Sequence, residues 1–401
     1  MSELDTIFNE ATKPSGTIQG AILTGVNKTG ITYSKRYGRN AIESDASPIS
    51  NNGVFKVASC TKLITTIAAL QCVERGLISL GESVYKILPE ISDLPIIHTP
   101  DEGKTISFTK PTKEITLRML LTHSSGLAYD GMSPASVTWR AERGQEPMVY
   151  PISGTVPECY ATPLLFEPGE GWIYGSGLDW AGYLVRRLNG NISLRDYFTT
   201  NIFEPVGRTA PFPTFDISDH PDMKARLVTC YERTEDGGLK EAVAPFGENA
   251  LDEHGGSGLA LTVPDYCAVL SDLLKDEPKL LKPETVKQMF TSQFQPDSPA
   301  LQGLLENSYV WLLNTGGVPP PEASVNYGLG GLLLLEGVPE LNIPANTLTW
   351  SGYTSPVWMV NRDRGIGGFF ATQMLPPGDP KTGELIAAYW KEHFGKDQSA
   401  S

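Results

Sequence analysis

Ser59 and Lys62 form the strongest chemical signal in the sequence, an S-x-x-K spacing at the start of an apolar segment. If this segment is a helix, residues three apart share one face, so the lysine amine can reach the serine hydroxyl. Burial and the positive end of the helix dipole both disfavour the ammonium form, which favours a neutral lysine that accepts the serine proton. The N–H groups at the same helix end can also face an oxyanion. The competing interpretation is a serine that caps the helix and a solvated lysine.

Tyr174 offers a second proton-transfer group. It lies between Pro168-Gly169 and Ser176, on a turn just before a predicted helix. A phenol that is hydrogen-bonded to a lysine moves towards phenolate, so Tyr174 can act as a base for Ser59 and later as an acid for the leaving group. The alternative is a structural tyrosine that closes a loop over the core. The order and context of these residues favour catalysis.

Histidine and cysteine carry no comparable signal. The five His and five Cys residues are scattered without the spacings of a metal site, so we expect neither a metal nor any other cofactor. His123 lies in a Thr-His-Ser-Ser-Gly turn and is interpreted as structural, because Lys62 and Tyr174 already provide proton transfer. Cys60 adjoins the candidate nucleophile, and we expect it to be an inert, packed thiol.

Composition excludes several partners. The 401 residues include 46 acidic and 32 basic side chains, a net charge of −14, with no basic block, which argues against binding to nucleic acid or to an anionic membrane. No stretch approaches the roughly 20 apolar residues of a membrane span. The first 13 residues resemble an acidic amphipathic helix and not a signal sequence. Together with the unclustered cysteines, these features predict a cytoplasmic protein.

The elements that must position these residues predict an α/β fold. A strand pair is expected at 20–26 and 31–37 around an Asn-Lys-Thr-Gly turn, with later strands at 327–336, 346–351, 357–360 and 367–374. Residues 60–75 are apolar nearly all round and predict a buried central helix. Further helices are expected at 1–13, 117–121, 178–189, 193–201, 264–275, 283–291 and 384–394.

These elements suggest two domains with the site at their junction. Residues 1–75 and 325–401 are predicted to form one antiparallel sheet flanked by the terminal helices, and 76–324 an inserted, mainly helical domain. Three segments, 95–114, 129–166 and 294–324, are rich in Pro, Gly and Ser and are expected to be long loops, either lids or binding loops.

Four runs together resemble the serine β-lactamase-like family, in particular its class C branch of β-lactamases and esterases. They are Phe55-Lys-Val-Ala-Ser-Cys-Thr-Lys62, Leu120-Leu-Thr-His-Ser-Ser-Gly-Leu127, the block from Pro168 to Tyr174, and Gly255-Gly-Ser-Gly-Leu259. The chain looks most similar to fungal acyltransferases that tailor polyketides, as in the lovastatin pathway. The resemblance implies a β-lactamase/transpeptidase-like fold and a covalent acyl-Ser59 intermediate.

The family's third motif, a Lys-Thr-Gly on a sheet strand, has two candidates. Lys381-Thr-Gly383 has the literal residues but opens the last predicted helix, so we regard it as a decoy. Trp350-Ser351-Gly352 ends a predicted strand and is the better match. Trp in place of Lys removes a positive charge that would hold a carboxylate, which disfavours penicillin and favours an ester or thioester.

The resemblance also implies further site residues. By analogy, the backbone N–H groups of Ser59 and Tyr353 form the oxyanion hole. Two departures leave the shape of the pocket open, because Ser176 replaces a common Asn and the bulky Tyr353 occupies a position that is often small. The candidate substrate-binding residues are Trp350, Ser351, Gly352, Trp172 and Tyr129, although aromatic residues in loops are as often part of the core.

We therefore expect a serine acyltransferase, or transesterase, that acts on small molecules. It would move an acyl group from a thioester or ester donor, through acyl-Ser59, to a hydroxyl of a polyketide-type secondary metabolite. The donor is expected to be carried by an acyl carrier protein or by coenzyme A. A carboxylesterase of the same fold is the nearest alternative, and a non-hydrolytic, repurposed or binding member is the second.

Overall fold

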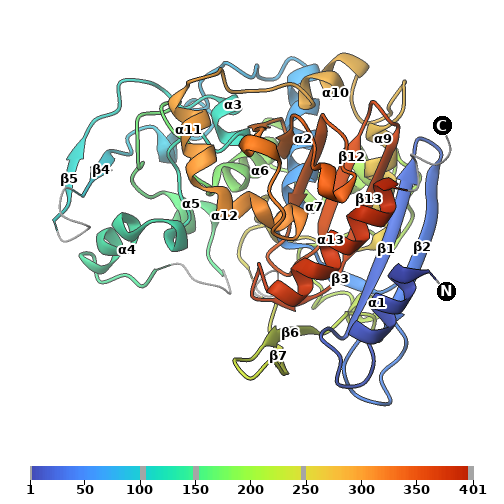
Figure 1. Ribbon diagram of the computed structural model, residues 1–401. Coiled ribbons are helices and arrows are strands. Elements are labelled where there is room, and N and C mark those ends of the chain that lie inside the picture. The colour runs from blue at the N-terminus through green and yellow to red at the C-terminus, as the bar shows by residue number, and fades with distance from the viewer. Residues whose placement is uncertain (1, 100–104, 148–152, 245–249, 396–401) are drawn as a thin grey trace.

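A seven-stranded antiparallel sheet joins the two ends of the chain. The computed structural model describes residues 2–99, 105–147, 153–244 and 250–395 (Figure 1). The strands are β1 (Gly20–Asn27), β2 (Gly30–Gly38), β9 (Val325–Tyr327), β10 (Leu332–Leu334), β11 (Thr347–Ser351), β12 (Val357–Asn361) and β13 (Ile366–Ala371). Their order is β2-β1-β13-β12-β11-β10-β9, so the N-terminal hairpin pairs with the C-terminal strands through β1 and β13. This arrangement confirms the predicted α/β fold.

Helices cover both faces of the sheet. The terminal helices α1 (Glu3–Ala11) and α13 (Pro380–Gly395) lie together on one face, where Phe8 and Tyr389 pack on Phe370 (Figure 1). The opposite face carries α9 (Val263–Leu273), whose Tyr266 stacks on Phe369 with ring centroids 4.7 Å apart. Since α9 comes from the middle of the chain, the range 76–324 also contributes to the sheet layer; the domain boundaries stay a prediction.

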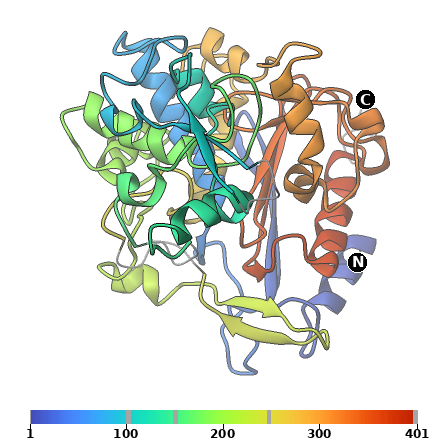
Figure 2. The same cartoon turned by 90° about the vertical axis from the view of Figure 1, so that its left-hand side faces the viewer.

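The central helix α2 (Thr61–Glu74) links the sheet to the helical part. Every residue from Thr61 to Cys72 is buried, as the all-round apolar pattern predicts. It packs on α6 (Gly177–Leu188) and α7 (Leu194–Phe198), and the helical part lies beside the sheet in the turned view (Figure 2). The other helices are α3 (Leu117–Leu121), α4 (Pro134–Ala141), α5 (Val156–Tyr160), α8 (Pro221–Lys224), α10 (Pro283–Met289), α11 (Pro299–Glu306) and α12 (Ser308–Trp311).

Short strands complete the fold. They form the pairs β3 (Val54–Lys56) with β8 (Ala260–Thr262) and β4 (Ile96–His98) with β5 (Ser107–Thr109). A third small sheet contains β14 (Met374–Leu375), β6 (Cys230–Arg233) and β7 (Leu239–Ala242). Among the described residues, no helix combines the length and apolar character that crossing a membrane requires.

Two of the expected loops contain helices. The segment 129–166 holds α4 and α5, and 294–324 holds α11 and α12. Some of the Ser and Pro residues that suggest loops there start helices instead. Ser133, Ser298 and also Thr155 accept from backbone N–H groups, and Pro lies in each following first turn. Smaller differences concern strands and ends. The single strand expected at 327–336 corresponds to the end of β9 and to β10, and the strand expected at 367–374 is divided into β13 and β14, which belong to different sheets. The last helix, α13, begins at Pro380.

Candidate active site

Ser59 lies in a short 3-10 turn, η1 (Ala58–Cys60), between β3 and the start of α2. Ala58, the residue before it, has a φ of +46°, which is unusual for a residue with a side chain. Such strain is held only where the surrounding structure fixes it, and here β3 and the buried helix α2 hold both ends of the turn. The turn leaves Ser59 half-buried and Lys62, one turn into the helix, buried.

The Oγ atom of Ser59 has two proton-transfer groups beside it. The hydroxyl of Tyr174 lies 2.6 Å away and Nζ of Lys62 lies 3.3 Å away. Tyr174 is partly exposed whereas the Lys62 side chain is only 2% exposed, so the two groups approach Oγ from the open and from the closed side of the site. The structure thus brings together the three residues that the sequence names as catalytic candidates.

Lys62 makes its hydrogen bonds to residues other than Tyr174. Nζ donates to the carbonyl of Gly256 at 2.8 Å and lies 3.2 Å from the hydroxyl of Tyr129. It contacts Tyr174 through the aromatic ring, with Nζ 4.7 Å from the ring centroid. The direct hydrogen bond between phenol and lysine that the sequence suggests is therefore replaced by a shared contact with Ser59.

Tyr129 makes contacts that the sequence does not predict. Its hydroxyl is directed to Lys62 and donates to Oδ2 of Asp179 at 2.7 Å, while its role as a wall of an acyl pocket stays a prediction. Asp179 also accepts from the N–H of Gly256 at 2.9 Å. Sequence reasoning missed Asp179 and Gly256 as site residues. The available signals were an acidic residue in the first turn of the helix after Tyr174 and the glycine pair at 255–256.

The loop that carries Tyr174 is fixed from behind by His123. The carbonyl of His123 accepts from the N–H of Ile173 at 3.1 Å, and its Nδ1 accepts from Gly175 at 3.3 Å. Its ring centroid lies 4.8 Å from that of Tyr174. Burial lowers the pKa of His123 well below its usual range, so the ring is neutral. A Cβ atom on Gly175 would overlap the carbonyl oxygen of Leu127, which explains the glycine after Tyr174.

Cys60 and Ser176 flank the site without reaching its reactive atoms. Cys60 is fully buried, its thiol lies 3.6 Å from the carbonyl of Pro356, and burial raises its pKa well above the usual range. Ser176, where the family commonly has Asn, is fully buried, and its hydroxyl has no hydrogen-bond partner among the described residues. Among the described residues, a side-chain hydroxyl that does contact Lys62 is that of Tyr129.

Trp350 and Trp172 are buried in one aromatic cluster. The ring centroid of Trp350 lies 5.3 Å from that of Tyr174 and 5.6 Å from that of Tyr327. Trp172 packs on His123 and Tyr327 at 6.0 and 6.1 Å, and it is 3% exposed. Both tryptophans therefore pack around the loop that carries Tyr174, and both are almost entirely buried.

The segment after β11 lies alongside the segment that carries Ser59. The hydroxyl of Thr354 donates to the carbonyl of Lys56 at 2.8 Å. A Cβ atom on Gly352 would overlap the carbonyl oxygen of Val57, so this approach requires glycine. Tyr353 comes directly after this contact; its side chain packs on the small third sheet, and burial raises its pKa.

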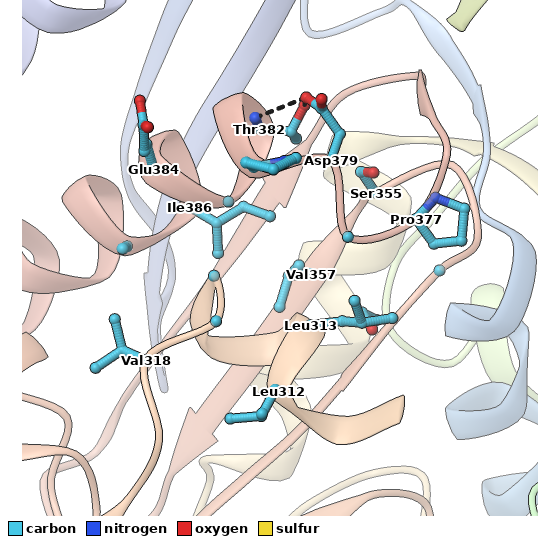
Figure 3. A pocket seen from close by; sticks show the side chains of 18 residues that line it. Leu312, Leu313, Val318, Ser355, Val357, Pro377, Asp379, Thr382, Glu384 and Ile386 are labelled. Carbon is cyan, nitrogen blue, oxygen red and sulfur yellow. Dashed lines mark hydrogen bonds between the residues drawn. The ribbon is translucent and has the colours of Figure 1, made fainter. Parts of the chain in front are cut away.

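A pocket of about 470 Å³ opens on the α13 side of the end of β11 (Figure 3). Ser351 and Gly352 line it together with apolar side chains, which are Leu312, Leu313, Val318, Val357, Ile386 and Ala387. Trp350 faces the other side of the sheet, because successive residues of a strand alternate. The predicted substrate-binding residues are therefore divided between the two faces of β11.

The described residues contain no group of three or more His, Cys, Asp or Glu side chains that could hold a metal ion. The polar groups that converge on Ser59 are an amine and a phenol. An amine and a phenol at hydrogen-bond distance from a serine hydroxyl can carry out proton transfer for a nucleophilic serine.

An antiparallel sheet covered by terminal helices, with a Ser-x-x-Lys helix and a tyrosine meeting at its edge, defines the serine β-lactamase-like enzymes. The chain belongs to the Beta-lactamase family, whose model matches residues 4–389.

Among its relatives, the acyltransferase calJ of Penicillium decumbens is 42% identical, with 98% of each chain covered. The lovastatin esterase of Penicillium rubens is 36% identical and covers 96% of this chain and 95% of its own. A solved structure of the simvastatin synthase LovD from Aspergillus terreus, the LovD6 mutant, superposes with a TM-score of 0.87 at 31% identity. It covers 99% of this chain and 97% of its own.

Proposed function

We propose that the protein is a serine acyltransferase that forms an acyl-Ser59 intermediate. The observation that carries this proposal is the position of Oγ of Ser59, which lies 2.6 Å from the hydroxyl of Tyr174 and 3.3 Å from Nζ of Lys62. A half-exposed serine with two proton-transfer groups has the arrangement of an activated nucleophile.

The proposed reaction has two halves. Oγ of Ser59 attacks the carbonyl carbon of the donor while Lys62 takes the hydroxyl proton. The C–S or C–O bond of the donor then breaks, and Tyr174 protonates the leaving thiolate or alkoxide. In the second half the acceptor alcohol gives its proton to Tyr174 and attacks the acyl carbon, and Lys62 returns its proton to Ser59.

For the oxyanion of each tetrahedral intermediate we propose the backbone N–H groups of Ser59 and Tyr353. Support comes from the close approach of the two segments, since Gly352 packs on the carbonyl of Val57 and Thr354 bonds to the carbonyl of Lys56. The helix dipole of α2, which begins just after Ser59, favours negative charge at the same point.

We propose a hydroxyl group of a polyketide-type metabolite as the acceptor and a thioester of an acyl carrier protein or of coenzyme A as the donor. The acyltransferase and simvastatin synthase relatives support acyl transfer to a small molecule. Trp350 stands where a cationic residue would hold a substrate carboxylate, which also favours an uncharged ester or thioester.

The proposal for substrate binding draws on the pocket at the end of β11. We propose that Ser351 and Gly352 contact the apolar part of one substrate in this pocket, whose walls are mainly aliphatic (Figure 3). Trp350 and Trp172 would act on the other face of the strand, where Trp350 packs on the catalytic tyrosine.

A carboxylesterase is the second candidate, favoured by the similarity to the lovastatin esterase. The same acyl-Ser59 intermediate would be released by water instead of an alcohol. The two reactions differ in how well the loaded site excludes water.

We also propose a cytoplasmic location. All five cysteines are free, buried thiols, which suits a reducing compartment.

Product analysis tests the proposal. The purified protein is incubated with butanoyl and 2-methylbutanoyl thioesters and a panel of polycyclic alcohols, and the ester and free acid are quantified. We expect the ester to dominate and both products to vanish in Ser59→Ala. Free acid alone would assign the protein to the esterases, and products unchanged in Ser59→Ala would overturn the Ser59 mechanism.

A further inference from the structure

Asp179 is a buried carboxylate behind the lysine, and the reaction proposed above does not use it. Its side chain has no exposed surface. Oδ2 accepts from the hydroxyl of Tyr129 at 2.7 Å and Oδ1 accepts from the N–H of Gly256 at 2.9 Å. Both oxygens are thus hydrogen-bonded, as a buried carboxylate requires.

Lys62 binds the same two residues from the other side. Nζ lies 2.8 Å from the carbonyl oxygen of Gly256 and 3.2 Å from the hydroxyl of Tyr129. Lys62, Tyr129, Asp179 and Gly256 therefore form a closed ring of hydrogen bonds that joins α2, α6 and two loops. A side chain at position 256 would overlap the Asp179 carboxylate and lie 2.7 Å from the Tyr129 hydroxyl, so the ring requires glycine.

The direction of the hydrogen bonds in this ring is fixed by what each group can do. An ionised carboxylate only accepts, so Tyr129 must give its single proton to Asp179. The oxygen of Tyr129 can then only accept from Lys62, and the carbonyl of Gly256 also only accepts. Two hydrogens of the Lys62 amine are therefore committed. The remaining position on the nitrogen faces Ser59 at 3.3 Å, and it is the one that can hold a lone pair.

We propose that Asp179 is a positioning residue that directs the lone pair of neutral Lys62 to Ser59, acting through Tyr129. When Ser59 attacks, its O–H bond breaks, an N–H bond forms on Lys62, and the Oγ electron pair forms the bond to the acyl carbon. The negative charge of Asp179 then balances the ammonium group, as a buried carboxylate does for the histidine of a serine-protease triad. This role rests on the proposed function of Ser59. It goes beyond that function because it names the residue that orients the proton acceptor, Lys62.

The Asp179→Asn variant changes this pattern with little change in shape. An amide can donate to Tyr129, which frees the Tyr129 proton to point at Lys62 and to draw the lone pair away from Ser59. We expect the rate of acyl-enzyme formation from p-nitrophenyl butyrate to fall at least about tenfold. Loss of the negative charge disfavours the ammonium form, so the acidic limb of the pH–rate profile should move to lower pH.

Among the described residues, the titratable groups near Lys62 and Asp179 include Tyr129, Tyr174, His123, Cys60, Cys159 and His254. Nδ1 of His254 lies 3.9 Å from Oδ1 of Asp179. All of these groups are retained in the Asp179→Asn variant, so a shift of the acidic limb of its pH–rate profile reports the loss of the carboxylate. The matched control is Asp272→Asn. Asp272 is equally buried but accepts from backbone N–H groups of residues 279 and 280, so we expect an unchanged profile.

Tyr129→Phe gives a second, independent test, which also applies if Asp179→Asn does not fold. It removes the link between Asp179 and Lys62, so acylation should slow to a similar degree. Adding Asp179→Asn to Tyr129→Phe should lower the acylation rate by less than about a further threefold, because both changes act through the same series of hydrogen bonds. If both single variants form the acyl-enzyme at the wild-type rate, with the acidic limb of the pH–rate profile unchanged, the proposed role of Asp179 is wrong. The acyl-Ser59 intermediate would still be supported by that result. If the wild type forms no acyl-enzyme, the proposed function itself fails.

Discussion

The hydroxyl of Tyr174 lies 2.6 Å from Oγ of Ser59, although 115 residues separate the two in sequence. Tyr174 is partly exposed, whereas Lys62 on the other side of Oγ is buried. A substrate that enters from solvent therefore meets the phenol and not the amine. This geometry supports the proposed role of Tyr174 in protonating the leaving group.

Tyr174→Phe removes the hydroxyl while the ring can keep its packing on His123 and Trp350. If Tyr174 is the acid, the rate at which an ethyl ester acylates Ser59 should fall about 10²–10⁴-fold. The rate of acylation by a p-nitrophenyl ester should fall much less, because p-nitrophenolate leaves without a proton. Single-turnover kinetics of acylation with both esters measure the difference, since the second half of the reaction also uses Tyr174. An equal loss for the two leaving groups would show that Tyr174 is not the acid.

Ala387→Trp fills the pocket that Ser351 and Gly352 line. A bulky apolar substrate should then lose about 60 Å² of apolar contact, which corresponds to about a tenfold rise in KM. Small acetyl esters should be affected much less, since they have little apolar surface to bury in the pocket. Lys391→Trp, at an exposed position of the same helix, is the matched control. A similar rise in KM for both variants, or for the acetyl esters, would argue against a substrate role for this pocket.

His123 should make the protein less stable in acid. Burial lowers its pKa in the folded protein, so below pH of about 6.5 the unfolded chain takes up a proton that the folded chain does not. The stabilisation is present above that pH and is lost as pH falls, by up to about 1.4 kcal/mol per pH unit.

His123→Asn tests this. Asn tolerates the positive φ of +60° at this position and can accept from Gly175. Urea unfolding at pH 7.5, 6.5 and 5.5 should show wild type losing stability faster than the variant on acidification. Parallel losses would mean that His123 titrates normally.

Cys60 should be chemically silent although it adjoins the nucleophile. Burial raises the pKa of its thiol, and the thiolate is the reactive form. Iodoacetamide at pH 8 should leave Cys60 unmodified in the native protein and alkylate it in urea, as peptide mass spectrometry would record. Rapid native labelling of Cys60 would contradict the packed environment described above.

The sequence alone predicts the pairing of Ser59 with Lys62 but not the contact between Tyr129 and Asp179, and the reason is their separation along the chain. Ser59 and Lys62 could be paired in advance because one helical turn separates them. Asp179 could not be paired with Tyr129, because 50 residues separate them and their contact depends on how α6 packs beside α2. An acidic residue in the first turn of a helix is common, so this signal alone does not distinguish Asp179 from a residue that interacts only with the helix dipole.

The fold is predicted only in part for the same reason, since contacts between segments that are far apart in sequence leave no local pattern. The terminal strands show their alternation locally, but the β1–β13 pairing that closes the sheet is a tertiary contact. The helices α4 and α11 were hidden because their Ser and Pro start residues are also loop formers. The sequence predicts Trp350 and Ser351 as substrate-binding residues together, whereas strand alternation directs them to opposite faces of β11.

The central claim is the acyl-Ser59 intermediate. Intact-mass analysis after brief mixing with a 2-methylbutanoyl thioester, followed by peptide mapping of the quenched protein, tests it most directly. We predict one added acyl group, located on the peptide that contains Ser59 and absent from Ser59→Ala. An adduct on another residue, or no adduct with a range of thioesters and no labelling by a fluorophosphonate, would contradict the account.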